Sequence, residues 1–192
     1  MSRTVVLAAA ISLALAACTG NTPDTVTATT PAATPAPAEN PLLAASTLPF
    51  GAPMFDRIKD SDYLPAFEEG MKQHLAEMRK IADNPEPATF ENTIEAQERT
   101  GETLSRISRI FFGLVQADTN PERQKIQEEI APKLAAHQDE IALDPKLFAR
   151  VKSVYDARAT LKLDPEQLRL VERDYQELVR AGAQLSDGDK AQ

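Results

Sequence analysis

Residue types that can carry chemistry are sparse in this chain, which has one cysteine, Cys18, and two histidines, His74 and His137. Cys18 lies in the stretch LALAACTG, at the end of an apolar run, and His74 begins the stretch HLAEM. A single thiol in such a place can be a nucleophile, half of an intermolecular disulfide, a core residue or an attachment point. A nucleophile needs a base and a shaped pocket, which the apolar run does not supply. The residues around the thiol therefore have to distinguish the remaining roles.

The N-terminus has the pattern of a secretory signal. Arg3 gives a short, positively charged start, and residues 4–17 are small or apolar, uncharged, and too few to cross a bilayer as a helix. The tetrapeptide Leu15-Ala16-Ala17-Cys18 resembles the lipobox of bacterial lipoproteins. This resemblance implies that 1–17 is a signal peptide and that the sulfur of Cys18 is lipidated. A signal without lipidation and a redox role for the thiol are the alternatives.

The stretch after the cysteine has the composition of a tether. Residues 19–40, TGNTPDTVTATTPAATPAPAEN, are rich in Thr, Ala and Pro and contain no Leu, Ile or aromatic residue. Such a stretch cannot bury enough apolar surface to offset the entropy lost on ordering. We therefore expect 18–40 to be a disordered linker that is lipid-anchored at its start. Thr19, rather than Asp, follows the cysteine, and lipoprotein sorting in enteric-type bacteria then implies the outer membrane of the cell envelope, facing the periplasm.

The net charge and the cysteine content argue against two kinds of binding partner and against internal disulfides. The net charge of −8 argues against nucleic-acid binding and against polybasic attachment to anionic lipid. Membrane contact is therefore expected only through the lipid anchor. Because Cys18 is the sole cysteine, the folded part has no internal disulfide.

From residue 41 to 192 the chain has the periodicity of helices and few strand signals. Apolar residues recur at three- and four-residue steps through 62–83 and through 89–116. Further helices begin where a polar cap precedes proline, at Thr119-Asn120-Pro121, Asp144-Pro145 and Asp164-Pro165. Short connections between long helices imply antiparallel neighbours. The predicted fold class is therefore all-α, an antiparallel helical bundle.

Two residues are expected to disturb these helices. Gly101, inside the second periodic stretch, is either a local weakness or a place where another helix approaches closely. Pro132, inside the third, predicts a kink or break near Ala131.

No arrangement in this helical block predicts catalysis. HLAEM lacks the second histidine of H-E-x-x-H, and His74 with Glu77 is a pair without a third metal ligand. Polar neighbours predict that His74 and His137 are both partly exposed. We therefore predict no catalytic residue, no metal ligand and no cofactor in this chain. Other conspicuous pairs are expected to be solvated carboxylates or core aromatics: Glu68-Glu69, Glu128-Glu129 and Phe111-Phe112.

The order of several segments nevertheless resembles the N-terminal helical region of the thimet oligopeptidase family of zinc metallopeptidases, closest to its bacterial peptidyl-dipeptidase and oligopeptidase A branch. The matching segments are NPLLAASTLPFGAPMFDRIKDSDYLPAFEEGM (40–71), FENTIEAQERTGETLSRISRIFFGL (90–114), TNPERQKIQEEIAPKLAAHQDEI (119–141) and LFARVKSVYDARATLKLDPEQLRLVERDYQELVRAGAQLSDGDK (147–190).

This resemblance implies a mostly helical, two-lobed peptidase with a deep channel for short peptides. Residues 41–192 would be its N-terminal lobe and form one wall of the substrate channel. The family's zinc is held by an H-E-x-x-H helix and a later Glu, which lie beyond the matching region, so no catalytic or metal residue is carried over.

The C-terminus suggests a piece of a longer chain. Ser186-Asp187 has the character of another helix start, and the chain stops at Gln192 without a cap. We therefore expect the N-terminal portion of a lipid-anchored zinc peptidase acting on oligopeptides, inactive on its own. The alternative is a non-catalytic, lipid-anchored helical module that binds peptides or a partner protein.

Overall fold

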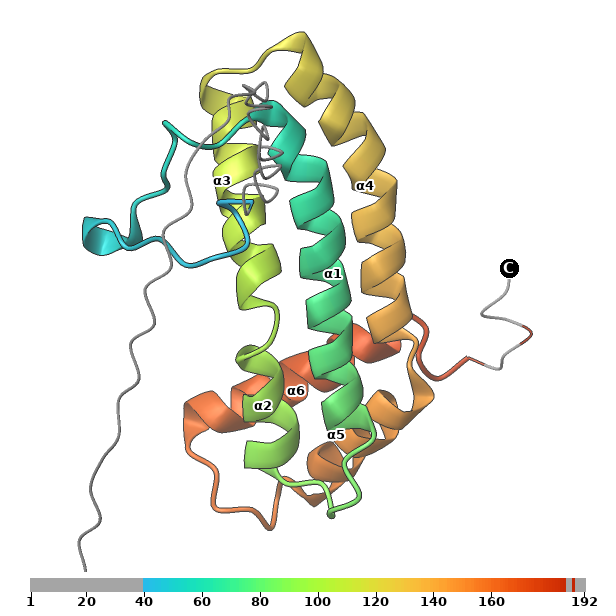
Figure 1. Ribbon diagram of the computed structural model, residues 1–192. Coiled ribbons are helices and arrows are strands. Elements are labelled where there is room, and N and C mark those ends of the chain that lie inside the picture. Colours follow the sequence, from blue (N-terminus) through green and yellow to red (C-terminus); the bar gives the residue numbers. More distant parts are fainter. Residues whose placement is uncertain (1–39, 186–187, 189–192) are drawn as a thin grey trace, which may run out of the picture. The chain divides into compact units, whose positions relative to one another are not determined.

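The computed structural model describes residues 40–185 and 188, and all regular elements in that part are helical. The all-α prediction is therefore confirmed. Cys18, the predicted signal 1–17 and nearly all of the predicted linker lie outside the described residues, as does Ser186-Asp187. In chain order the elements are η1 (Pro49–Gly51), α1 (Asp60–Ala82), η2 (Phe90–Glu95), α2 (Ala96–Glu98), α3 (Glu102–Ala117), α4 (Pro121–Ala142), α5 (Pro145–Ala157) and α6 (Pro165–Arg180) (Figure 1).

The three predicted polar caps are confirmed. The Asn120 side chain accepts the backbone N–H of Arg123 at 2.7 Å. Asp144 and Asp164 each accept two backbone N–H groups of the first turn that follows them. Proline then occupies the first helical position, where its missing N–H would have had no partner inside the helix. None of the helices in the described part is long and apolar enough to cross a membrane.

The stretch 89–116 is interrupted, although its periodicity predicted one continuous helical pattern. Thr89 caps η2, its Oγ1 accepting the N–H of Asn92 at 3.1 Å. The continuous helical stretch formed by η2 and α2 ends at Glu98. The chain then turns at Gly101, whose φ is 71°, before α3 begins. This left-handed conformation favours glycine, because any Cβ would be strained there. The local weakness expected at Gly101 is thus a real break.

Of the kink or break predicted near Ala131, the break is wrong, because α4 runs from Pro121 to Ala142 with Pro132 inside it. Proline removes one hydrogen bond and crowds the carbonyl four residues earlier, that of Glu128. Glu128 and Pro132 are both exposed, so water can solvate that carbonyl. Ile130, just before the proline, is fully buried, and its packing holds the helix in place.

Helix α1 lies between α3 and α4 (Figure 1). Polar side chains join α1 to α4 at sequence separations that stay between 61 and 65. A constant separation means that the two helices run parallel and in register. The predicted antiparallel arrangement therefore holds for α3, which runs opposite to both α1 and α4, but not for α1 and α4 themselves. The four joined pairs are Asp60–Arg123, Glu68–Lys133, His74–His137 and Arg79–Glu140.

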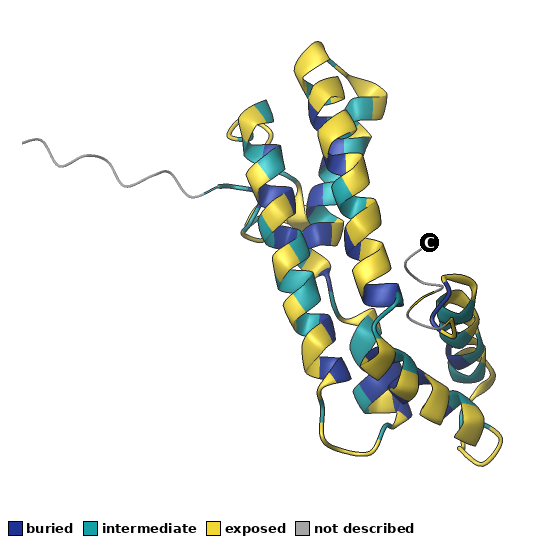
Figure 2. Ribbon diagram, turned by 90° about the vertical axis from the view of Figure 1, so that its right-hand side faces the viewer, coloured by how far each residue is buried: buried dark blue, intermediate teal, exposed yellow. Residues whose placement is uncertain are grey.

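The contact between α1 and α3 is close and apolar. Tyr63 and Phe67 pack on Phe111 with ring centroids 4.9 and 5.4 Å apart. One turn further along α1, Gly70 faces the backbone of Leu104, and a Cβ at Gly70 would lie 3.2 Å from the Leu104 Cα. The absence of a side chain at Gly70 therefore sets how closely the helices approach. Figure 2 shows the buried residues (dark blue) along the facing sides of the long helices.

Helices α5 and α6 pack with η2 around a second group of apolar residues. Arg150 of α5 is buried among them, and its Nη1 donates to the carbonyls of Asn84 and Glu86, each at 2.8 Å. Its Nη2 donates to the side chains of Asn92 and Thr93. This arginine thereby fixes the connection after α1 onto α5, a role that its place in the sequence does not predict.

Two glycines inside helices should respond in opposite ways to alanine. In Gly70→Ala the new Cβ meets the Leu104 backbone, which cannot move without separating α1 from α3, so we expect a loss of about 1–2 kcal/mol of unfolding free energy. In Gly113→Ala the Cβ meets nothing within 4 Å, and helix propensity should add about 0.5–1 kcal/mol. Urea unfolding of the full chain measures both. Equal signs for the two variants would contradict the packing described for Gly70.

Candidate functional site

A cleft of about 290 Å³ that combines charged, imidazole and apolar side chains lies where α6 faces α1, α2 and α4. Its charged lining includes Glu98, Arg173, Asp174 and Glu177, with His74 at one side. Apolar residues form the rest of the wall, among them Met78 and Leu178. We call this the α6 cleft.

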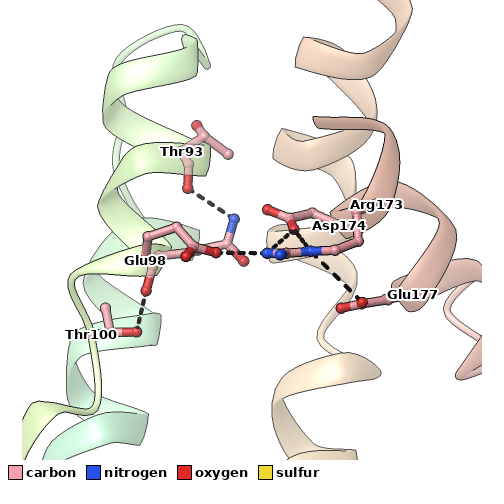
Figure 3. A network of polar contacts seen from close by, with 7 residues as sticks. Thr93, Glu98, Thr100, Arg173, Asp174 and Glu177 are labelled. Carbon is pink, nitrogen blue, oxygen red and sulfur yellow. Dashed lines mark hydrogen bonds and ion pairs between the residues drawn. The ribbon is translucent and has the colours of Figure 1, made fainter. Parts of the chain in front are cut away.

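Arg173 is the centre of the polar network in the cleft (Figure 3). Its Nη2 lies 2.9 Å from Oε1 of Glu98 on α2 and 3.2 Å from Oδ1 of Asp174. Its Nε is 3.8 Å from Oε1 of Glu177 one turn along. One guanidinium therefore faces three carboxylates, an arrangement that leaves an excess of negative charge.

Among the carboxyl groups of the described residues, Asp174 has the most strongly shifted pKa. Its side chain is only 12% exposed, and burial raises its pKa to about 6, against the lowering effect of Arg173. The negative charges of Glu98 and Glu177 raise the pKa further. A carboxyl group with this pKa exchanges its proton near neutral pH.

The two histidines contact each other at the edge of the cleft. Nδ1 of His74 lies 3.0 Å from Nε2 of His137, so one ring donates and the other accepts. Burial lowers the pKa of both imidazoles, and for His74 the neighbouring His137 lowers it further. His74 is partly exposed, as predicted, but His137 is buried with 8% exposure. The predicted exposure of His137 is therefore wrong, because its partner on α1 lies 63 residues away in the sequence.

Glu77 is not available to a metal beside His74. Its Oε2 accepts the backbone N–H of Gly101 at 2.7 Å, which holds the turn before α3. The ring of His74 lies against the same glycine, 3.1 Å from where a Cβ would stand. The close approach expected at Gly101 is therefore confirmed, and the neighbour is a side chain of α1.

The zinc implied by the family resemblance does not fit the described residues. Among residues 40–185 and 188, no group of three or more His, Cys, Asp or Glu side chains could hold a metal ion. The facing nitrogens of His74 and His137 already use each other as partners. The described residues that line the α6 cleft also include neither serine nor cysteine. In this part of the chain the cleft offers charged groups, one of which is a buried carboxyl group with a raised pKa, Asp174.

Most members of the other singled-out pairs lie where the sequence predicted, although Glu69 is only partly exposed. Glu68 and Glu129 are exposed and share Lys133 as an ion-pair partner at 2.6 and 3.1 Å. Phe111 is fully buried and contacts Phe112 edge-on. Arg173 and Asp174 were missed because the sequence shows only charges on an amphipathic helix. The one available signal was the adjacency of Arg and Asp among the apolar residues of LVERDYQELV.

The histidine pair and Asp174 should give opposite pH dependences of stability. Lowered imidazole pKa values mean that the folded state binds protons less readily than the unfolded state. The folded state is therefore destabilised by the histidine pair as the pH falls through about 6.5. The raised pKa of Asp174 means that the folded state binds this proton more readily than the unfolded state. The ionised carboxylate therefore destabilises the fold above about pH 6, and its protonation relieves this at lower pH.

Relative to wild type, His137→Gln should therefore gain stability as pH falls from 8 to 5, whereas Asp174→Asn should lose it. Each difference can change by at most about 1.4 kcal/mol per pH unit, the limit for one proton. Urea unfolding at a series of pH values measures both. If the unfolding free energy of a variant changes with pH in the same way as that of wild type, the replaced group does not titrate as described.

No protein-family model matches the chain. The chain is 47% identical over 152 residues to proteins named dipeptidyl carboxypeptidase from Salmonella typhimurium and from Escherichia coli. The matched residues are 79% of this chain but only 22% of each relative's length. Most of this chain is thus similar to a segment, roughly a fifth, of dipeptidyl carboxypeptidase.

Proposed function

We propose that this chain is a non-catalytic part of a longer peptidase that removes dipeptides from the carboxyl ends of short peptides. The observation that carries the proposal is the 47% identity to dipeptidyl carboxypeptidases, sustained over 152 residues. Peptide hydrolysis would be performed by the larger part of the enzyme, which corresponds to the part of the relatives that lies outside the matched segment. The zinc that the family resemblance implies would be held there too.

The role of this segment would be to form a wall of the channel that admits the substrate. The long helices α1, α3 and α4 supply a packed support. The α6 cleft supplies charged groups on a concave surface, with Arg173 and Glu98 about half exposed. Groups of both signs can pair with the charged ends and side chains of short peptides, so we place the peptide-facing surface at this cleft.

The cellular setting is part of the same proposal. The lipobox-like residues that end at Cys18, together with Thr19, favour a lipid-anchored protein at the outer membrane. The stretch 19–40 would hold the helical domain in the periplasm, where short peptides are available as substrates.

A hybrid enzyme tests the peptidase proposal. In it, the matched region of Escherichia coli dipeptidyl carboxypeptidase is replaced by the corresponding 152 residues of this chain. We expect the hybrid to release C-terminal dipeptides from a short unstructured peptide with kcat/KM within about tenfold of the relative. The relative with this region deleted, and this chain alone, should both be inactive.

The proposal would be wrong if the hybrid folds, as judged by circular dichroism, but hydrolyses no peptide. Saturable peptide binding by this chain alone, together with an inactive hybrid, would favour the alternative of a peptide-binding module.

Lipidation is tested at Cys18. In Cys18→Ser the acceptor sulfur is lost, so the protein should lack the mass of the lipid and should be an uncleaved or soluble species in an expressing bacterium. Mass spectrometry and fractionation provide the measurement, with the wild-type chain as control. Unchanged mass and fractionation in the variant would refute the anchor.

A further inference from the structure

The segment before α1 exposes large apolar side chains. Phe50 is fully exposed, Phe55 is 54% exposed and Leu48 is 43% exposed. This segment (blue in Figure 1) runs on the α3 side of α1, and η1 within it stands apart from the long helices. Three of the five exposed large hydrophobic residues of the described part thus fall within eight positions. Clustered exposure of this kind marks an interaction site more often than scattered exposure does.

The backbone at Phe50 is also unusual. Its φ of 60° makes it the one residue other than glycine with a positive φ among the described residues. For a bulky residue this conformation is an outlier that costs energy. The ring is fully exposed, so no packing within the described domain compensates for that cost. A partner that covers the ring would supply the missing contact.

A groove adjoins these residues. It has a volume of about 560 Å³ and is lined by the exposed segment and by one face of α3, including Ile110 and Leu114. Its charged lining residues are Arg106 and Arg109, and no acidic residue lines it. Arg109 donates to Oγ of Ser105 at 2.8 Å, and no ion pair is seen for it in the described part. In a chain of net charge −8, this groove is a basic and apolar exception.

We propose that the groove, with Phe50 and Phe55, is the surface on which the remaining part of the peptidase polypeptide docks. This inference rests on the proposed function. The occupant would be an apolar segment with a carboxylate facing Arg109. Almost four fifths of the length of the curated relatives has no counterpart in this chain, so a docking polypeptide of sufficient size exists in those proteins.

Two other candidate occupants, a second copy of the chain and a bilayer, match the shape and charge of the groove less well. A second copy of the chain across a two-fold axis would bring the same surface together with itself, and so would place Arg109 of one copy near basic groups of the other. A bilayer is flat, whereas the groove is concave, and the net charge of −8 opposes approach to anionic lipid. A complementary protein segment satisfies both the shape and the charge.

Thiol accessibility at position 50 tests the docking directly. Phe50→Cys is made in a Cys18→Ser background, in this chain alone and in the hybrid peptidase described above. Maleimide modification of residue 50, followed by peptide mass spectrometry, should be about tenfold slower or more in the hybrid, because the thiol is covered there. Leu161→Cys is the matched control, since Leu161 is exposed outside the groove, and it should react equally in both proteins.

A second variant separates docking from folding. Phe50→Gly relieves the left-handed strain, so the melting temperature of the chain alone should stay unchanged or rise by up to about 3 °C. In the hybrid the same change removes a docking contact, so its melting temperature should fall. An opposite effect in the two proteins cannot arise from the local backbone alone.

Each outcome decides the proposal. An active hybrid in which residue 50 reacts as fast as in the chain alone would overturn the docking surface and leave the proposed function intact. An inactive, folded hybrid would overturn both. Protection that grows with the concentration of the chain alone, or on addition of phosphatidylglycerol vesicles, would assign the surface to a second copy or to a membrane, and so would also overturn it.

Discussion

The close approach of α1 to α3 is the constraint on which the rest of the structure depends. It is possible because glycine stands at Gly70 on α1 and at Gly101 before α3, where side chains would meet Leu104 and His74. With α3 held this near, the rings of Tyr63 and Phe111 pack 4.9 Å apart. The imidazole of His74 is confined by Gly101 on one side and meets His137 of α4 on the other. One helix pair thereby positions the third helix.

The polar pairs between α1 and α4 specify register more than they stabilise the domain. Arg79–Glu140 and Glu68–Lys133 are largely exposed, and such pairs contribute little because water and salt screen them. Asp60–Arg123 differs, since both side chains are about four fifths buried. Burial raises the pKa of Asp60, but hydrogen bonds from Asn120 and Arg123 outweigh this and leave that pKa below its usual range. The stabilising free energy comes mainly from the apolar residues between the helices.

Features decided within a few residues were predictable from the sequence, and features decided by distant residues were not. The caps at Asn120, Asp144 and Asp164 depend on their own first turns and lie where expected. Pro132 does not end α4, because its local cost is offset by the packing of Ile130. His137 is buried where it contacts His74, and Arg150 makes four hydrogen bonds. These contacts join residues that are 57 to 66 positions apart in the sequence. Periodicity predicts which face of a helix is apolar, but it does not say which helix will cover it.

The charged α6 cleft is difficult to explain by stability alone. Helix α6 is already held by buried Val171 and by the stacking of Tyr175 on Tyr155 at 3.8 Å. Burying Asp174, and placing it beside two further carboxylates, adds a cost that is seen in the raised pKa of that residue. Carboxyl groups perturbed in this way concentrate where proteins bind or transform ligands. Under the proposed function, an apolar, basic groove and an acidic cleft under α6 would serve two different tasks, attachment to the rest of the enzyme and contact with its substrate.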